Sequence, residues 1–386
     1  MPITAFTAKT LYTPDLVPNG VVLIEDDRVL AAGSREAIEI PAGATEVKVA
    51  GCIAPGFIDI HNHGGGGRDV MEASAEAMEV ICRLLASFGT TSFYPTTGSA
   101  ATADILRSVE FLAGYVEQSA SSGHARAHPL GIHMEGPYLS PKRRGAHPEK
   151  FVVEPTLDAY RAFAQAAKGQ LRIMTIAPEI GHATEVIEEM LGNGVQPSIG
   201  HTDATYEEAD RAVRLGARQA THMFNAMRPF RHRDPGVIAK VLSDPSIKAE
   251  LIADGVHVDP KAIDMLYRAK GSGGIVLISD GISATGMPDG VYEVVGLQVE
   301  VKEGVCRYQG TLAGSVLTLD QAVRNMIEFT GMPAWEAIRM ATLNTAKLMG
   351  VEDRKGCLKT GADADLLLLT DDLRIQKVYA RGAEVQ

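Results

Sequence analysis

Residues 53–63 of the chain read IAPGFIDIHNH, an apolar run that ends in two histidines. Such a run predicts a buried β-strand. Side chains two residues apart lie on the same face of a strand, so His61 and His63 can converge on one cation. An exposed histidine pair in a flexible loop is the alternative. The apolar strand ahead of the pair and the nearby Asp59 favour the cation site.

The same order, an apolar run and then a polar residue, recurs along the chain. The polar residues that follow such runs are Glu135, His201, His222, His257 and Asp280. Helical patterns separate most of the runs, as at 75–88 and at 205–215, where Asp203 is the expected N-cap. Eight strand–helix units predict a parallel (β/α)8 barrel of the TIM type, although the pattern alone also fits an open sheet. The eight runs are 53–60, 91–95, 129–134, 171–176, 196–199, 219–221, 249–253 and 275–279.

Short strand patterns occupy both ends of the chain. They are 21–24 and 29–32 near the N-terminus, and 365–370 and 375–380 near the C-terminus. Neither end has enough strand to form a stable sheet alone. We therefore expect an α/β protein with two domains. Residues 1–54 and 355–386 together form a small β-sandwich domain, and residues 55–354 form the barrel.

Polar residues at the carboxyl ends of barrel strands lie at one mouth, where TIM barrels carry their active sites. Glu135, His201 and His222 would form a two-histidine, one-carboxylate set that suits zinc or ferrous iron and leaves room for water. Taken singly, each histidine fits a structural role, and Glu135 fits a salt bridge at a strand end. A carboxylate placed directly after an apolar strand needs a partner, and a metal ion supplies one.

Asp280 follows 275–279, the most apolar run of the series. A carboxylate there can hold a water at a metal ion and move its proton. The alternative is that Asp280 caps the turn that begins at Gly281. His257 could donate a hydrogen bond to an oxyanion, or it could be a plain surface histidine.

The composition narrows the classes of partner and compartment. The formal net charge is −11, which argues against nucleic acid and against an anionic membrane surface. Local basic clusters at 142–144 and 231–233 could still bind a phosphate. Four widely spaced cysteines and an N-terminus without a signal-peptide pattern indicate a cytoplasmic protein with reduced thiols.

These motifs resemble the amidohydrolase superfamily and, more closely, its branch that deacetylates N-acetylglucosamine 6-phosphate. The resemblance extends over nearly the whole chain, and the combination of His147, Asn225 to Met227 and Arg233 is its most specific part. The matching segments are 55–59, 133–137, 145–147, 200–202, 221–222, 225–227, 234–236, 254–257, 279–280 and 312–315.

The resemblance implies a role for each candidate residue. Glu135, His201 and His222 would hold the main divalent metal. His61 and His63 would allow a second ion, with Glu135 as the bridge. Zinc is the expected metal, with iron, cobalt or manganese as alternatives. Asp280 would be the catalytic acid and base, and His257 would polarise the acetamide carbonyl. The residues expected to bind substrate are Ala146, His147, Asn225, Ala226, Arg233, His257, Leu312, Ala313 and Gly314.

The implied substrate is a phosphorylated N-acetyl amino sugar, and the implied assembly is a homodimer, because the family's arginine at the position of Arg233 reaches into the neighbouring subunit's site. Three other functions stay open. The chain could act on N-acetylgalactosamine 6-phosphate or on a different amide, or it could be a non-catalytic scaffold. The presence of every expected ligand and of Asp280 speaks against the scaffold.

Overall fold

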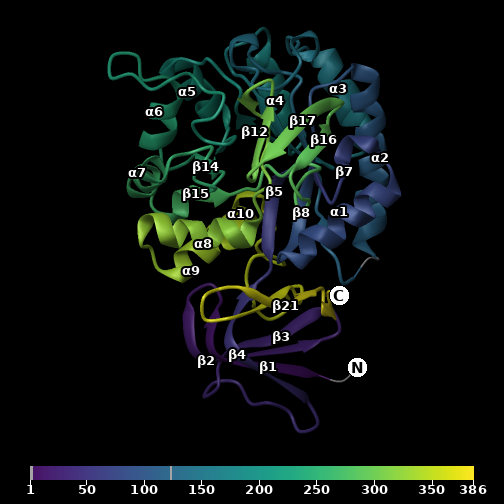
Figure 1. Cartoon of the computed structure of the whole chain (residues 1–386), viewed down its shortest axis with the longest axis vertical. Coiled ribbons are helices and arrows are strands. Elements are labelled where there is room, and N and C mark those ends of the chain that lie inside the picture. Colours follow the sequence, from purple (N-terminus) through teal and green to yellow (C-terminus); the bar gives the residue numbers. More distant parts are fainter. Residues whose placement is uncertain (1–2, 122–123) are drawn as a thin grey trace.

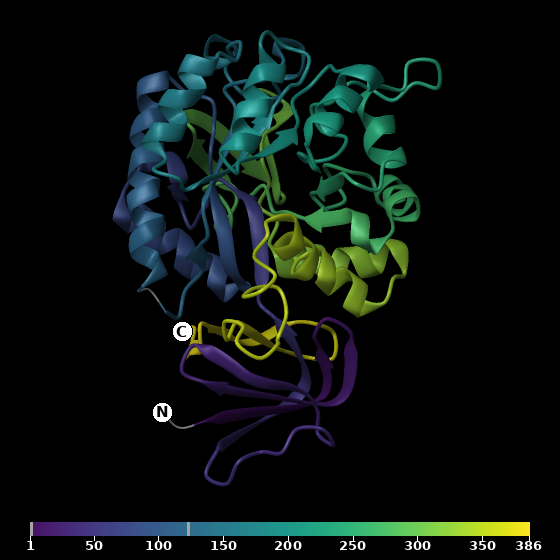
Figure 2. The same ribbon diagram turned by 180° about the vertical axis from the view of Figure 1, so that it is seen from behind.

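The computed structural model describes residues 3–121 and 124–386 and consists of a barrel above a smaller β-domain (Figures 1 and 2). Eight parallel strands form the barrel wall. In order around the sheet they are β15 (Ile275–Leu277), β14 (Lys248–Leu251), β13 (Gln219–Ala220), β12 (Gln196–Ile199), β11 (Leu171–Ile176), β10 (Ile132–Glu135), β8 (Thr90–Thr97) and β5 (Phe57–Asn62), and β9 (His128–Pro129) pairs with β8. All eight expected strands are present.

The first and last strands meet and close the barrel. The backbone N–H of Asp280 donates to the His61 carbonyl at 2.9 Å, and the His63 N–H donates to the Gly281 carbonyl at 2.7 Å. The TIM-like prediction is therefore confirmed over the open sheet. The expected strand over 53–60 is wrong in one respect: residues 53–55 are the end of β4 (Thr45–Pro55), which belongs to a different sheet, and β5 begins at Phe57.

Helices surround the barrel (Figure 1) and bury their apolar faces against the strands in one large core. They are α1 (Ala75–Ser87), α2 (Thr102–Ala120), α3 (Leu157–Ala166), α4 (Ala183–Gly192), α5 (Tyr206–Leu215), α6 (Gly236–Ser243), α7 (Pro260–Lys270), α8 (Leu319–Thr330), α9 (Ala334–Met340) and α10 (Leu343–Leu348), with short 3-10 turns at Val70–Glu72, Pro141–Arg143, Glu149–Phe151 and Ser272–Gly274.

The start of α5 differs from expectation. Its N-cap is Thr205, whose hydroxyl accepts from the Glu208 N–H while the Glu208 carboxylate accepts from the Thr205 N–H. This reciprocal pair satisfies two donors at the helix start. Asp203 lies two residues earlier and accepts a hydrogen bond from Arg143 instead.

The small domain joins the two ends of the chain. Its strands lie in the order β22 (Ala383–Glu384), β21 (Ile375–Ala380), β20 (Leu366–Leu369), β4 (Thr45–Pro55), β1 (Thr4–Tyr12), β2 (Leu16–Glu25) and β3 (Arg28–Ser34). The two halves of the expected sandwich are thus one continuous sheet, in which β4 pairs with β1 on one side and β20 on the other. The boundaries at 54 and 355 stay a prediction.

A second, smaller sheet is inserted between β15 and α8. It consists of β16 (Gly290–Val294), β17 (Leu297–Lys302), β18 (Val305–Tyr308) and β19 (Thr311–Leu312). A short hairpin, β6 (Gly64–Gly65) with β7 (Arg68–Asp69), follows β5. The inserted sheet has its own apolar cluster and contributes residues to the cavity described next.

Candidate active site

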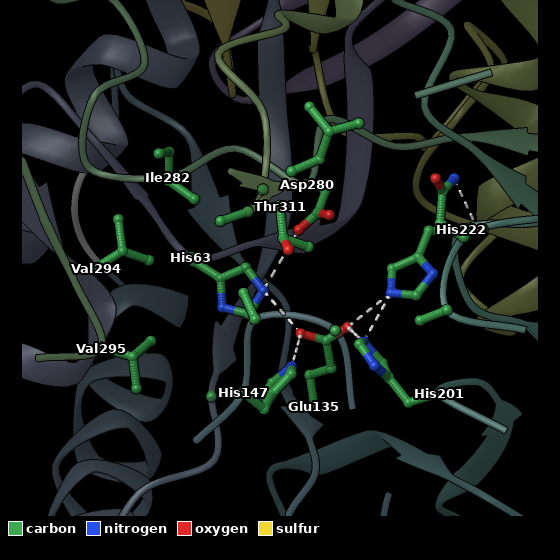
Figure 3. Close-up of a pocket in the computed structure, with 18 of the residues that line it drawn as sticks. His63, Glu135, His147, His201, His222, Asp280, Ile282, Val294, Val295 and Thr311 are labelled. Carbon is green, nitrogen blue, oxygen red and sulfur yellow. Dashed lines mark hydrogen bonds and ion pairs between the residues drawn. The ribbon is translucent and has the colours of Figure 1, made fainter. Parts of the chain in front are cut away.

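A cavity of about 370 Å³ opens at the carboxyl ends of the barrel strands (Figure 3). Of the residues expected to form the site, all but His61 and Arg233 line it: His63, Glu135, Ala146, His147, His201, His222, Asn225, Ala226, His257, Asp280, Leu312, Ala313 and Gly314. His61 is fully buried behind the cavity wall. Side chains from the ends of different strands are thus gathered by closure of the barrel.

Three ligand-type atoms form a tight triangle. The Glu135 Oε1 atom lies 3.1 Å from His201 Nε2 and 3.0 Å from His222 Nε2, and the two nitrogens are 3.0 Å apart. Each N–H can point at only one acceptor, so three mutual contacts of this length are poorly served by hydrogen bonds. Atoms at this spacing around one point are what a two-histidine, one-carboxylate metal site requires.

A second group of ligand-type atoms lies beside the first. His61 Nε2 and His63 Nε2 are 3.2 Å apart, and Asp280 Oδ1 lies 3.5 Å from each. Glu135 faces both groups, because Oε1 lies 3.4 Å from His61 Nε2 and Oε2 lies 3.2 Å from His63 Nε2. The donor set therefore fits one ion or two, with Glu135 between them.

Hydrogen bonds on the far sides of two imidazoles fix their tautomers. His201 Nδ1 donates to the Arg143 carbonyl at 2.9 Å, and His61 Nδ1 donates to Glu250 Oε2 at 3.1 Å. In the neutral form of each ring, a proton on Nδ1 leaves a lone pair on Nε2, and both Nε2 atoms face Glu135 Oε1. This arrangement is the usual support of a metal-binding histidine.

His147 has the opposite tautomer. Its Nδ1 accepts from the Ser99 N–H at 3.3 Å, so Nε2 carries the proton and lies 3.3 Å from Glu135 Oε2. The ligand-type atoms of His147, Glu135 and His201 do lie within 4.8 Å of one another. Because the Nε2 lone pair of His147 is not available, its geometry suits a hydrogen-bond donor to substrate rather than a metal ligand.

Burial and opposite charge shift the pKa values at the centre. Burial would raise the pKa of Asp280, but His61 and His63 beside it lower it to about 2. Burial likewise opposes ionisation of Glu135, yet the charge of His61 and the hydrogen bonds of His147 and His201 hold its pKa well below the ordinary value. Burial lowers the pKa of His201 to about 4, so this imidazole is neutral, the form that binds metals.

His257 faces the cavity from the loop after β14. Its Nδ1 donates to Asp254 Oδ2 at 2.7 Å, and its backbone N–H donates to Asp254 Oδ1 at 2.8 Å. Burial would raise the pKa of Asp254, but the hydrogen bonds and charge of His257 lower it. The ionised Asp254 thus fixes the orientation of the His257 ring at the cavity wall.

His201, His222 and Asp280 have left-handed backbones. The φ angles are 45° at His201, 26° at His222 and 49° at Asp280. Positive φ is uncommon outside glycine and asparagine and costs free energy that the surrounding fold must supply. The strain turns each side chain from its strand end into the mouth of the barrel.

Asn225 and Ala226 lie next to His222. The Asn225 backbone N–H and its side-chain amide both donate to the His222 carbonyl, at 2.9 and 3.2 Å. Arg233 lies elsewhere, exposed on a turn in which Arg231 and Asp234 bond to each other. A loop within the segment that leads from β13 into α6 projects away from the barrel (Figures 1 and 2).

The sequence did not reveal Glu250 as part of the site. It is fully buried in β14 and accepts from the Gln219 amide as well as from His61. Glu250 lies inside an apolar run of the sequence. A carboxylate there could have indicated a buried polar partner, because an unpaired carboxylate is costly to bury. His133, in contrast, packs edge-on against His61, but its two ring nitrogens bond to the Ile60 carbonyl and the Thr175 hydroxyl rather than facing the other ligand atoms.

The chain belongs to the amidohydrolase family, whose model matches residues 52–385. The names of similar curated proteins indicate a more specific activity than the family does. The N-acetylglucosamine-6-phosphate deacetylase of Bacillus subtilis (strain 168) is 36% identical over 373 residues, 95% of this chain and 93% of its own length. The N-acetylgalactosamine-6-phosphate deacetylase of Escherichia coli O157:H7 is 36% identical over 92% of this chain and 93% of its own length.

The structural comparison agrees. The structure of an Asp-to-Ala mutant of N-acetyl-D-glucosamine-6-phosphate deacetylase from Mycobacterium smegmatis, in complex with N-acetyl-D-glucosamine-6-phosphate, superposes with a TM-score of 0.93 and 34% identity, and the match covers 100% of both chains. Similarity therefore extends through the barrel and the small domain alike.

Proposed function

We propose that the chain is a metal-dependent N-acetylglucosamine-6-phosphate deacetylase, which yields glucosamine 6-phosphate and acetate. The observation that carries the proposal is the convergence of Glu135, His201 and His222 beside Asp280 in one cavity. The similarity of the whole chain to deacetylases of this specificity supports it.

Glu135, His201 and His222 would hold the main ion, and His61 with His63 would permit a second. Two or more imidazoles with carboxylates favour zinc, and iron, cobalt or manganese are alternatives. When bound, such an ion acts as a Lewis acid on a carbonyl oxygen and lowers the pKa of water towards neutrality.

The protein's own residues would divide the remaining work. Asp280 accepts a proton as a water oxygen attacks the acetamide carbon, and His257 donates to the carbonyl oxygen as negative charge develops there. Asp280 then returns the proton to the amine nitrogen as the C–N bond breaks. This assignment uses one carboxylate as base and then as acid, which suits its place beside the ligand atoms of His61 and His63.

The substrate would lie across the cavity. His147, with its Nε2–H, and the backbone of Ala146 and of residues 312–314 would contact the sugar, and Asn225 with Ala226 would bind the phosphate. Arg233 is exposed outside this cavity, so we propose that it completes the phosphate site of a neighbouring subunit in a homodimer.

No helix of the described chain is long and apolar enough to span a membrane. All four cysteines are unpaired and buried, which supports our proposal of a reducing, cytoplasmic location.

Acetate release by the metal-replete protein tests the proposal. Turnover of N-acetylglucosamine 6-phosphate should exceed that of unphosphorylated N-acetylglucosamine by a large factor, because the phosphate contacts are lost with the latter. Equal rates on both sugars would contradict the phosphate site, and no acetate from either would send the search to other amides.

A second candidate differs only in the sugar. The similarity to the N-acetylgalactosamine-6-phosphate deacetylase of Escherichia coli O157:H7 makes the galacto epimer an alternative substrate. The two 6-phosphates differ at the C4 hydroxyl alone, so their kcat/KM values on the same preparation decide between them. Preference for the galacto form would replace the first assignment while leaving the metal chemistry intact.

A further inference from the structure

Val295 occupies an unusual turn in the inserted sheet. β16 and β17 are joined by Val295-Gly296, with φ angles of 49° and 76°. Two-residue turns with positive φ at both positions favour Asn-Gly or Asp-Gly, and a β-branched residue at the first position is a conformational outlier. The same sheet turns twice more through Glu303-Gly304 and Gln309-Gly310, where neither first residue is β-branched.

Contacts on both sides hold Val295 in this conformation. Its N–H donates to Asp69 Oδ2 at 2.8 Å, and Asp69 is itself buried and accepts from the Met71 N–H at 2.7 Å. The valine methyls pack onto Gly98, where a Cβ would lie 2.8 Å from Cγ2. An outlier fixed so firmly points to a function for the side chain.

The side chain lies between two cavities. Val295, Leu297 and Pro148 line the active-site cavity and also a neighbouring outer cavity of about 800 Å³. In Figure 3, Val294 and Val295 lie on the far side of His63 from His201 and His222. Val295 thus forms part of the partition beyond the metal-ligand cluster.

The orientation of the substrate follows from its chemistry, and this step rests on the proposed function. The phosphate end lies near Asn225, which bonds to the His222 carbonyl. In a pyranose, C2 and C5 are on opposite sides of the ring, so the 2-acylamino group leads away from the 6-phosphate. With its carbonyl at the ligand cluster, the acyl chain is directed towards the apolar wall that contains Val294 and Val295.

We propose that Val295 sets the length of acyl group that the enzyme removes. The wall accommodates an acetyl methyl, and a longer chain would have to enter the outer cavity through the space that the valine fills. One methylene group in an apolar pocket is worth about tenfold or more in kcat/KM. The protein should therefore discriminate strongly against N-butyrylglucosamine 6-phosphate.

The test compares N-acetyl-, N-propionyl- and N-butyrylglucosamine 6-phosphate through the free amine that all three release. Val295→Gly removes the side chain and suits a positive φ. We expect it to raise the butyryl-to-acetyl ratio of kcat/KM by at least about tenfold. Val295→Ala, which keeps only Cβ, should raise the ratio in the same direction.

Two controls separate the wall from the turn. Val295→Asn relieves the backbone strain but keeps a side chain of similar size, and Glu303→Gly adds a glycine to an equivalent turn outside both cavities. Both should keep the wild-type ratio. An unchanged ratio in Val295→Gly, or an equal rise in Val295→Asn, would overturn the proposal while acetyl turnover stands. No amine release from the acetyl substrate by wild-type protein would overturn the proposed function and this proposal with it.

Discussion

Asp280 is fixed by the bonds that close the barrel. Its N–H donates to the His61 carbonyl, and its own carbonyl accepts from the Ser315 N–H at 2.8 Å. The carboxylate is therefore presented from a rigid backbone, and its Oδ1 lies 3.5 Å from both His61 and His63. A substitution confined to that carboxylate tests its chemistry without moving its support.

Asp280→Asn should lower kcat by about 10²–10⁴-fold, because the amide cannot accept a proton from water. The metal content should stay near the wild-type value, since Glu135, His201 and His222 remain. Acetate release and elemental analysis measure the two quantities, and Asp264→Asn on α7, outside the cavity, provides a control. Turnover close to wild type in Asp280→Asn would remove Asp280 from the mechanism.

At the residue scale, the sequence reveals those members of the site that follow an apolar run. His201, His222 and Asp280 could be predicted as site residues, because a polar side chain at the end of a buried strand needs a polar partner or a metal ion. Glu250 could not be paired with His61 in advance, because 189 residues separate them and only the closed barrel brings them together. The strained turn at Val295 likewise depends on a contact with Asp69, 226 residues away.

Among the elements, α5 carries the clearest stop and start signals. Thr205 and Glu208 form a reciprocal cap at its first turn, and Gly216 ends it with a φ of 136°. The helix lies outside the cavity, so its cap concerns stability alone.

Thr205→Ala should lower the free energy of unfolding by about 1 kcal/mol, because one hydroxyl acceptor for the helix N–H groups is lost. Chemical denaturation followed by circular dichroism measures the change. Thr205→Ser keeps the hydroxyl and should stay within a few tenths of the wild-type value. Equal losses in both variants would show that packing of the methyl, not the cap, matters here.

Element boundaries were predictable where turn residues bracket a run. Runs 171–176 and 196–199 coincide with β11 and β12. The run 53–60 contains parts of two strands from different sheets, and both parts are buried, so nothing in their hydrophobicity marks the change. The inserted sheet carries usable signals as well: residues 297–302 (LQVEVK) alternate between apolar and polar, and three X-Gly pairs mark its turns.

On the scale of the whole molecule, Arg233 provides a test of assembly. If it serves the neighbouring subunit, a mixed dimer of Arg233→Ala and Asp280→Asn contains one complete site, built from Asp280 of the first variant and Arg233 of the second. Mixing equal amounts of the two poorly active proteins under exchange conditions should then restore turnover towards a quarter of that of the wild type, because half of the dimers are mixed and each mixed dimer has one complete site of two. No recovery, with exchange verified by a size or tag assay, would place Arg233 outside the partner's site.

His128 links the stability of the whole molecule to pH. It is buried in β9 near Lys355 and Arg381, and burial with these charges lowers its pKa to about 3. In the unfolded chain, His128 binds a proton as the pH falls through about 6.5, whereas in the folded protein this imidazole stays neutral at that pH. Between pH 6.5 and 3 the unfolded state therefore binds more protons, and stability falls as the pH falls.

Wild-type protein should lose roughly 1 kcal/mol more than His128→Asn between pH 7.5 and 5.5, as measured by urea unfolding at both values. The comparison of pH slopes is independent of any constant cost of the substitution. His182→Asn, which removes an exposed histidine, should keep the wild-type slope. Identical slopes in all three proteins would show that His128 is not the titrating group.

The position of β4 between β1 and β20 has a consequence for synthesis on the ribosome. Strands β1 to β4 emerge early, but the neighbour that covers the other edge of β4 is among the last segments to be made. At ordinary elongation rates this leaves a hydrogen-bonding edge unpaired for roughly tens of seconds while the barrel is translated. During this time the nascent chain exposes an unpaired strand edge. Binding by a chaperone, or pairing with a chain on a neighbouring ribosome, then competes with folding.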